Sequence, residues 1–195
     1  MSTAKQTSDP DLFLVRQAQE GNQNSLTDLY RRHERRVYNF ALSTTGNPWD
    51  AADVTQEAFI KAFRSLGGFK GESLFTTWLH RIVMNTAYDY LRRHQPEPMD
   101  AETLNEISGQ TNALFGSEGI DPVMDSLSDP MRKALMELNE GFRFAIVLCD
   151  LLGFPYEEAA EILNVQEGTI KSRVFRARES LAKALKQVGY DLSID

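Results

Sequence analysis

The apolar residues near the end of the chain recur at every third or fourth position, which is the repeat of an α-helix with one buried face. They are spaced by 4, 3, 4, 3 and 4 positions and comprise Ile170, Val174, Ala177, Leu181, Ala184 and Val188. A shorter helix is predicted before them, because Pro155 suits a first helical turn and the acidic sequence YEEAAEIL follows it. Asn164 lies between the two helices, and asparagine is the non-glycine residue that best tolerates a left-handed turn.

The face opposite this apolar stripe is basic. It carries Thr169, Lys171, Ser172, Arg173, Phe175, Arg176, Arg178 and Glu179. A short helix, a tight turn and a longer helix with a basic outer face are typical of the helix-turn-helix, which lays its second helix in the major groove of DNA. Arg176 is expected to reach a guanine edge, and Lys171 and Ser172 a base or a phosphate. Arg173 and Arg178 suit phosphates. The alternative is an ordinary helix with a solvated basic face.

The rest of the chain also predicts helices, since alternating strand patterns and hairpin turns are missing. The predicted helices cover residues 11–21, 25–47, 51–66 and 76–94, with breaks at Gly21, Asn47-Pro48 and Gly67-Gly68 and before Pro96. Asp50 is expected to cap the third of them. The sequence therefore predicts an all-α protein.

Charge divides the chain into three parts. Residues 1–95 carry 12 basic and 10 acidic residues (+2), residues 96–128 carry none and 7 (−7), and residues 129–195 carry 9 and 11 (−2). The middle part is rich in Pro, Gly, Ser and Asp and has little helical periodicity. We therefore expect two small helical domains, residues 1–95 and 129–195, joined by a flexible acidic linker of residues 96–128.

Composition argues against several classes of protein. The single cysteine, Cys149, excludes an internal disulfide or a multi-cysteine zinc site, and its apolar neighbours predict a buried thiol. His33, His80 and His94 lack the spacing of metal ligands, and no Walker-type phosphate loop is present. The start of the chain lacks the apolar core of a signal peptide, and no run is long enough to cross a bilayer. We expect a cytoplasmic protein without membrane insertion, cofactor, metal or enzymatic activity.

The helix predicted for residues 76–94 has a second stripe beside its buried one. This stripe comprises Trp78, Arg81, Asn85, Tyr88 and Arg92, spaced by 3, 4, 3 and 4 positions. Aromatic rings stack on bases and an amide reads base edges, so the stripe suits single-stranded nucleic acid. Partly buried aromatic residues among surface arginines would produce the same periodicity, so both interpretations stay open.

The segment DVTQEAFIKAF has a polar face of a different kind. Val54, Ala58 and Phe63 can pack inward, which leaves four polar residues outside: Asp53, Gln56, Glu57 and Lys61. These residues are either a docking site for a protein or ordinary solvated surface.

Two segments together resemble the bacterial RNA polymerase sigma factors of the extracytoplasmic-function (group IV) class, within the sigma-70 family. Residues 53–93, DVTQEAF to DYLRR, are similar to the second conserved region of that family, and residues 153–181, GFPYEE to ARESL, to the fourth. The resemblance covers residues from about 12 to 188 apart from the linker. It implies an N-terminal helical bundle and a C-terminal four-helix domain that recruit core RNA polymerase, through its beta and beta-prime subunits, and recognise promoter DNA.

The resemblance also implies roles for particular residues. The exposed face with Asp53, Gln56 and Glu57, beside Lys61, matches the helix that docks on the clamp helices of the polymerase. The stripe around Asn85 matches the helix that reads the minus-10 element. The loop of Phe69, Lys70, Gly71, Glu72, Ser73 and Leu74 matches the pocket for a flipped base. Lys171, Ser172, Phe175 and Arg176, with Thr169 and Arg173 alongside, match positions that read the minus-35 element.

Two further expectations follow from the same resemblance, and one segment departs from it. An anti-sigma factor is a partner, since two weakly joined domains with exposed functional faces are easily clamped together. The acidic linker threads toward the active-site cleft of the polymerase, where it can imitate RNA electrostatically. The sequence Asn139-Glu140-Gly141 replaces the Leu-Pro-rich turn that is usual before the next helix, which leaves the start of that helix open.

Two other functions fit parts of the sequence. A stand-alone helix-turn-helix regulator that binds duplex DNA as a dimer explains residues 155–187 but neither the stripe nor the linker. A metal-dependent enzyme acting on nucleic acid needs clustered carboxylates in a preformed site. Glu157, Glu158 and Glu161 instead belong to the acidic start of a helix.

Overall fold

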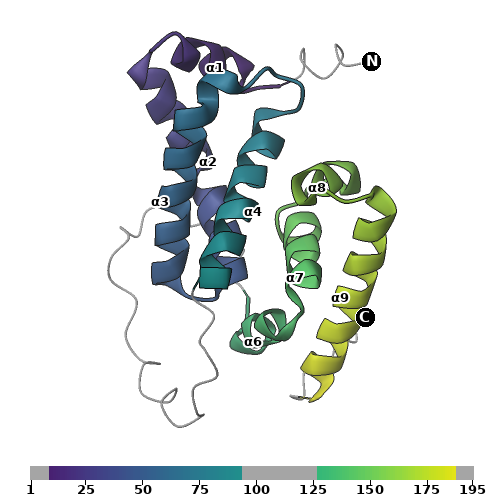
Figure 1. Cartoon of the computed structure of the whole chain (residues 1–195). Helices are drawn as coiled ribbons and strands as arrows, with labels where there is room; N and C mark the ends of the chain where they lie inside the picture. Colours follow the sequence, from purple (N-terminus) through teal and green to yellow (C-terminus); the bar gives the residue numbers. More distant parts are fainter. Residues whose placement is uncertain (1–8, 94–126, 188–195) are drawn as a thin grey trace.

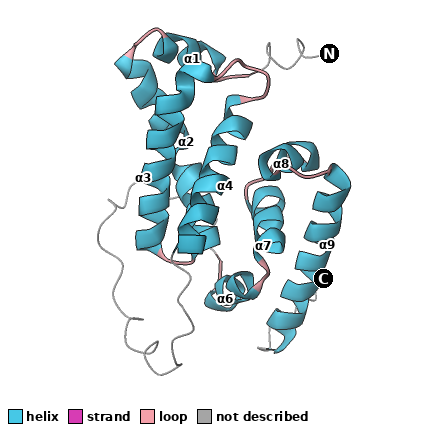
Figure 2. Ribbon diagram, viewed as in Figure 1, coloured by secondary structure: helices cyan, strands magenta, loops and turns pink. Residues whose placement is uncertain are grey.

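The computed structural model describes residues 9–93 and 127–187, and these residues form helices without any strand (Figures 1 and 2). The first half contains α1 (Leu12–Gln19), α2 (Gln23–Thr45), α3 (Pro48–Ser65), the 3-10 turn η2 (Leu66–Gly68) and α4 (Phe75–Arg93). The second half contains α6 (Asp129–Glu137), α7 (Glu140–Ile146), its π-helical continuation η3 (Val147–Leu151), α8 (Tyr156–Leu163) and α9 (Glu167–Gln187). The predicted all-α class is confirmed. Nearly all of the predicted linker lies outside the described residues.

Local side chains set the start of the long helices. The Asn22 carboxamide accepts hydrogen bonds from the backbone of Asn24 and Ser25, at 3.0 and 3.3 Å, and so begins α2. Asn47 begins α3 in the same way, through Trp49 N at 2.8 Å. The prediction that Asp50 caps α3 was wrong. Pro48 occupies the first helical position, which suits its fixed φ, and this places the cap one residue earlier at Asn47.

In the second half, the predicted turn at Asn164 is confirmed, and the start of α7 is now defined. Asn164 adopts left-handed angles, φ 51° and ψ 50°, between α8 and α9, as expected. Asn139 accepts a hydrogen bond from Gly141 N at 3.0 Å, which fixes the start of α7 that the sequence left open. Pro155 has an extended backbone and precedes α8, rather than forming its first residue. The turn and the two helices of the predicted helix-turn-helix are therefore present.

The apolar stripe of α9 differs from the prediction at its end. Ile170, Val174, Ala177 and Leu181 are buried as expected, but Leu185 continues the stripe, whereas Ala184 is half-buried. At 3.6 residues per turn, positions 184 and 185 lie on either side of the stripe, and the larger leucine takes the buried one. Val188 lies outside the described residues.

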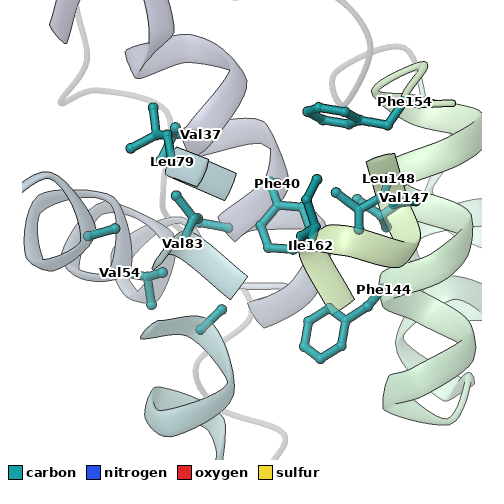
Figure 3. Close-up of a cluster of buried hydrophobic side chains, with 14 of the residues drawn as sticks. Val37, Phe40, Val54, Leu79, Val83, Phe144, Val147, Leu148, Phe154 and Ile162 are labelled. Atoms are coloured by element: carbon teal, nitrogen blue, oxygen red, sulfur yellow. The ribbon is translucent and has the colours of Figure 1, made fainter. Parts of the chain in front are cut away.

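The two halves, predicted as separate domains, pack against each other. Phe40 of α2 stacks on Phe144 of α7 with ring centroids 6.0 Å apart. Phe154, between η3 and α8, meets the ring of His80 on α4 edge-on at 4.7 Å. Arg36 of α2 lies 4.3 Å over the Phe154 ring and donates a hydrogen bond to Leu152 O at 2.5 Å. Figure 3 shows side chains of both halves gathered in one apolar cluster. We call these contacts the inter-half interface.

Candidate nucleic-acid and polymerase interfaces

The outer face of α9 is a polar surface with one large apolar side chain in its middle. Phe175 is 63% exposed, and Lys171, Ser172 and Arg176 are exposed around it. Lys171 Nζ forms an ion pair with Glu167 one turn earlier, at 2.7 Å, and this pair raises the pKa of the lysine. The Ser172 hydroxyl donates to Thr169 O at 2.9 Å. The structure thus brings the minus-35 candidates together on one face.

Two arginines at the border of this face differ in what holds them. Arg178 makes a bidentate ion pair with Asp150 of η3, with N···O distances of 2.8 and 2.7 Å, and this raises the pKa of its guanidinium. Asp150 therefore holds two of the five N–H donors of Arg178, which weighs against the phosphate contact expected of this residue. Arg173 is half-buried beside Gly141, where an added Cβ would meet its Cζ at 3.5 Å.

The second stripe of α4 combines packed and exposed residues. Trp78 is half-buried, with its ring 5.1 Å from Phe69 and 5.6 Å from Phe75. Asn85, Tyr88 and Arg92 are exposed. Trp78 thus matches the structural interpretation left open by the sequence, and the other residues remain accessible on the surface.

Arg81 connects this stripe to the other half of the molecule. Its Nε and Nη2 both donate to the backbone oxygen of Glu161 in α8, at 3.0 and 2.6 Å. Thr77, one turn earlier on α4, donates to the Glu158 carboxylate at 3.2 Å. The minus-10 candidate surface is therefore partly engaged by the helix-turn-helix, which no sequence pattern predicted (Figure 1).

The candidate flipped-base loop joins η2 to α4. Phe69 and Gly71 are buried, Lys70 and Glu72 are exposed, and Ser73 and Leu74 are half-buried. Gly71 has φ 73°, a left-handed conformation that favours glycine. Gln19 and Asp9 hold the two ends of this loop, and sequence reasoning missed both, because their partners lie 47 to 66 positions away.

The candidate docking face lies on α3. Asp53 and Gln56 are exposed, and the Glu57 carboxylate pairs with Lys61 at 2.8 Å and with Arg93 of α4 at 3.3 Å. The hydrogen bond from Lys61, with a smaller contribution from Arg93, lowers the pKa of Glu57. A surface groove is lined by Asp53, Gln56, Glu57, Ile60, Tyr90 and Arg93, and Ile60 is 44% exposed. Sequence reasoning missed Ile60, although an isoleucine at an outward position of an amphipathic helix is a detectable signal.

Three other titratable side chains, His33, His80 and Cys149, are fully or partly buried. His33 Nε2 lies 2.8 Å from the Asp11 carboxylate, and burial lowers the pKa of His80 to about 3. Cys149 is half-buried rather than buried, and desolvation together with Asp150 raises the pKa of its thiol to about 11. Among the described residues no group of three or more His, Cys, Asp or Glu is placed to hold a metal ion. Within the same residues, no helix combines the length and apolarity needed to span a bilayer.

Comparisons with known proteins place these surfaces in context. Residues 29–97 match the family model of sigma-70 region 2, and residues 128–181 match that of sigma-70 region 4. The RNA polymerase sigma-E factor of Escherichia coli K12, an extracytoplasmic-function protein, is 38% identical over 184 residues, covering 88% of this chain and 92% of the relative. The chain belongs to the extracytoplasmic-function sigma factors. As a sigma factor it directs promoter-specific initiation by RNA polymerase.

Further relatives match this chain over most of its length, in sequence or in structure. The RNA polymerase sigma-H factor of Pseudomonas aeruginosa is 34% identical over 186 residues, covering 92% of this chain and 96% of the relative. The structure of CnrH in complex with the cytosolic domain of CnrY aligns with a TM-score of 0.69 at 27% identity, covering 91% of this chain and 97% of that one. The Bartonella quintana sigma factor RpoE, in complex with the anti-sigma factor NepR, aligns with a TM-score of 0.62 at 30% identity, covering 82% and 96%. A stand-alone helix-turn-helix regulator does not account for the match to region 2.

Proposed function

We propose that this sigma factor reads a promoter with two separate surfaces and docks on core RNA polymerase with a third. The minus-35 surface is the outer face of α9, formed by Thr169, Lys171, Ser172, Arg173, Phe175 and Arg176. The observation that carries this assignment is Phe175, which is 63% exposed in the middle of a basic face. A thymine methyl group in the major groove is a suitable apolar partner for this ring.

The minus-10 surface is the α4 stripe together with the loop of residues 69–74. Exposed Asn85 and Tyr88 supply an amide and a ring of the kind that contact unpaired bases. Buried Phe69 and half-buried Trp78 stiffen the boundary between the loop and the helix. We assign base discrimination to this region because strands separate there and a single base can be examined from its edge.

The polymerase surface is the α3 groove with Asp53, Gln56, Glu57 and Lys61. Its chemistry supports docking of helices, since the exposed apolar side chain of Ile60 lies among carboxylates. Apolar contact in the groove supplies affinity, and the charges around it fix the register of the partner.

Simultaneous reading of both elements requires the two halves to separate. The two elements lie about 25 base pairs apart, which is roughly 85 Å of duplex at ~3.4 Å per base pair. In the described arrangement, however, Arg81 of α4 is hydrogen-bonded to Glu161 of α8. We therefore assign this arrangement to the free sigma factor, and the open arrangement to the promoter-bound state.

Regulation by an anti-sigma factor is part of the same proposal. The relative RpoE was solved in complex with NepR, which is described as an anti-sigma factor. An inhibitor that holds the two halves together would block promoter reading without touching most of the DNA-binding residues. We also propose that the sigma factor works in the cytoplasm, where polymerase is, and contributes no catalytic group of its own.

The test is co-purification with core polymerase followed by transcription in vitro from a promoter library. The sigma factor should co-purify with core enzyme and confer initiation at a restricted set of sequences. Binding to duplex DNA as a dimer, without polymerase and without any gain in initiation, would contradict the proposal.

A further inference from the structure

The loop of residues 69–74 is held at both ends by the segment that precedes α2. At its entry, Gln19 Nε2 of α1 donates to Leu66 O and to Phe69 O, both at 2.9 Å. At its exit, the Asp9 carboxylate accepts from the backbone nitrogen of Phe75, the first residue of α4, at 2.8 Å. Two residues ten positions apart in sequence therefore clamp one loop from opposite ends.

The Gln19 contact depends on the two protons of a primary amide. Leu66 O and Phe69 O lie at the two ends of the η2 turn, and Phe69 N donates to Leu66 O across it at 3.0 Å. The Gln19 carboxamide nitrogen carries two donors and contacts both carbonyls. A glutamate at this position has nearly the same shape but offers only acceptors at neutral pH, so it would turn both attractions into repulsions.

The Asp9 contact depends on charge at a helix start. The first backbone N–H groups of a helix lack partners within it, and the helix dipole favours a carboxylate at this end. Asp9 also accepts from Asp11 N at 2.9 Å. The carboxylate of Asp11 is fully buried and is bound by Arg32 at 2.6 Å and His33 at 2.8 Å. The clamp is thus anchored to α2 rather than to a free chain end.

We propose that Gln19 and Asp9 are positioning residues for base recognition by this loop. They act by fixing the backbone on both sides of residues 69–74. The inference rests on the proposed role of that loop. Without the Gln19 contact, the carbonyls of Leu66 and Phe69 bind water instead, and without the Asp9 contact, the backbone nitrogen at the start of α4 does so. The loop then loses its fixed backbone, and the base pocket that it forms accepts other bases.

The test uses holoenzyme and a promoter library randomised across the minus-10 element. Gln19→Glu should lower base discrimination at one minus-10 position by about fivefold, a size expected for losing hydrogen bonds of ordinary strength. Asp9→Ala should relax the same position. The matched control is Gln17→Glu on the same helix, because the Gln17 side-chain oxygen accepts from the Ser25 hydroxyl at 2.9 Å and a carboxylate oxygen retains that contact. The control adds the same charge and should change no position.

A second arm separates failure of this inference from failure of the proposed function. Lys70→Ala and Ser73→Ala change the loop itself, so they should alter preference at the position that the loop reads. If they do and Gln19→Glu and Asp9→Ala do not, the positioning role is overturned while the loop assignment stands. If none of the four variants alters any minus-10 position, the loop assignment itself is overturned. A Gln19→Glu variant that loses thermal stability but keeps full base preference would also overturn the positioning role.

Discussion

Truncating Phe154 should open the molecule without unfolding either half. The ring projects from the segment between η3 and α8 and contacts the other half through His80 and Arg36. It is 5% exposed in the closed arrangement. In an open arrangement both contacts are lost, so an alanine at this position removes stabilisation from the closed state and little from the open one.

The magnitude follows from burial and ring contacts. Full burial of a phenylalanine side chain contributes about 1.5–3 kcal/mol. Its edge-on contact with the His80 ring and the stacked Arg36 guanidinium each add roughly 0.5–1 kcal/mol. The closed state should therefore lose about 3 kcal/mol in the Phe154→Ala variant, which shifts the closed-to-open ratio by roughly a hundredfold.

Energy transfer between two dyes measures this opening directly. Exposed Asn24 and Lys186 provide one labelling site in each half after substitution by cysteine, in a Cys149→Ser background. Phe154→Ala should lower transfer efficiency and raise affinity for a single-stranded minus-10 oligonucleotide, because Arg81 is released from Glu161. Phe13→Ala, on a ring that is 69% exposed, is the control and should change neither quantity. Unchanged transfer in a folded Phe154→Ala protein would refute the inter-half interface as the element that holds the free form closed.

Three further predictions concern other groups. Burial lowers the pKa of His80 from 6.5 to about 3, with Arg36 and His33 adding repulsion, so the closed state needs neutral His80. Closure should therefore weaken in the same dye assay as the pH falls from 6.5 toward 3, and His80→Gln should remove this dependence. Asp53→Lys with Glu57→Lys should abolish co-purification with core polymerase while circular dichroism stays unchanged, and a wild-type yield at the same salt would contradict the docking face. Binding of a minus-35 duplex should be titrated at several salt concentrations. Arg173→Ala should lower the affinity for all sequences alike and reduce the slope of log K against log salt by about one unit. Arg178→Ala should leave that slope unchanged, because Arg178 is already paired with Asp150 in the unmodified protein.

The elements of the fold follow from local sequence signals. The α9 stripe as far as Leu181, the left-handed turn at Asn164 and the break at Gly21 after α1 each depend on residues within a few positions, so periodicity and capping rules suffice to predict them. The wrong prediction of the α3 cap also involved neighbouring residues. Asn47 and Asp50 both have capping side chains, and the proline between them decides in favour of Asn47.

Long-range contacts escaped prediction for a different physical reason. The partners of Gln19, Asp9 and Arg81 lie between 47 and 80 positions away, and no periodic pattern connects them. Arg178 illustrates the same point, because nothing in the sequence around it indicates that its side chain pairs with Asp150. The residues on each candidate face could be predicted from the sequence, whereas the contacts of these residues with other helices could not.

We propose that Arg176 on α9 and Asn85 on α4 read different promoter elements. Both side chains are exposed, one in each half. A bidentate arginine contact to guanine is worth about 1–3 kcal/mol of discrimination, so Arg176→Ala should relax one minus-35 base pair by about 5- to 150-fold.

The decisive measurement is transcription in vitro by each variant from a library randomised at both elements. Arg176→Ala should change preference only within the minus-35 element, and Asn85→Ala only within the minus-10 element. Shifts at the same bases for both variants, or at none, would contradict the two-surface account.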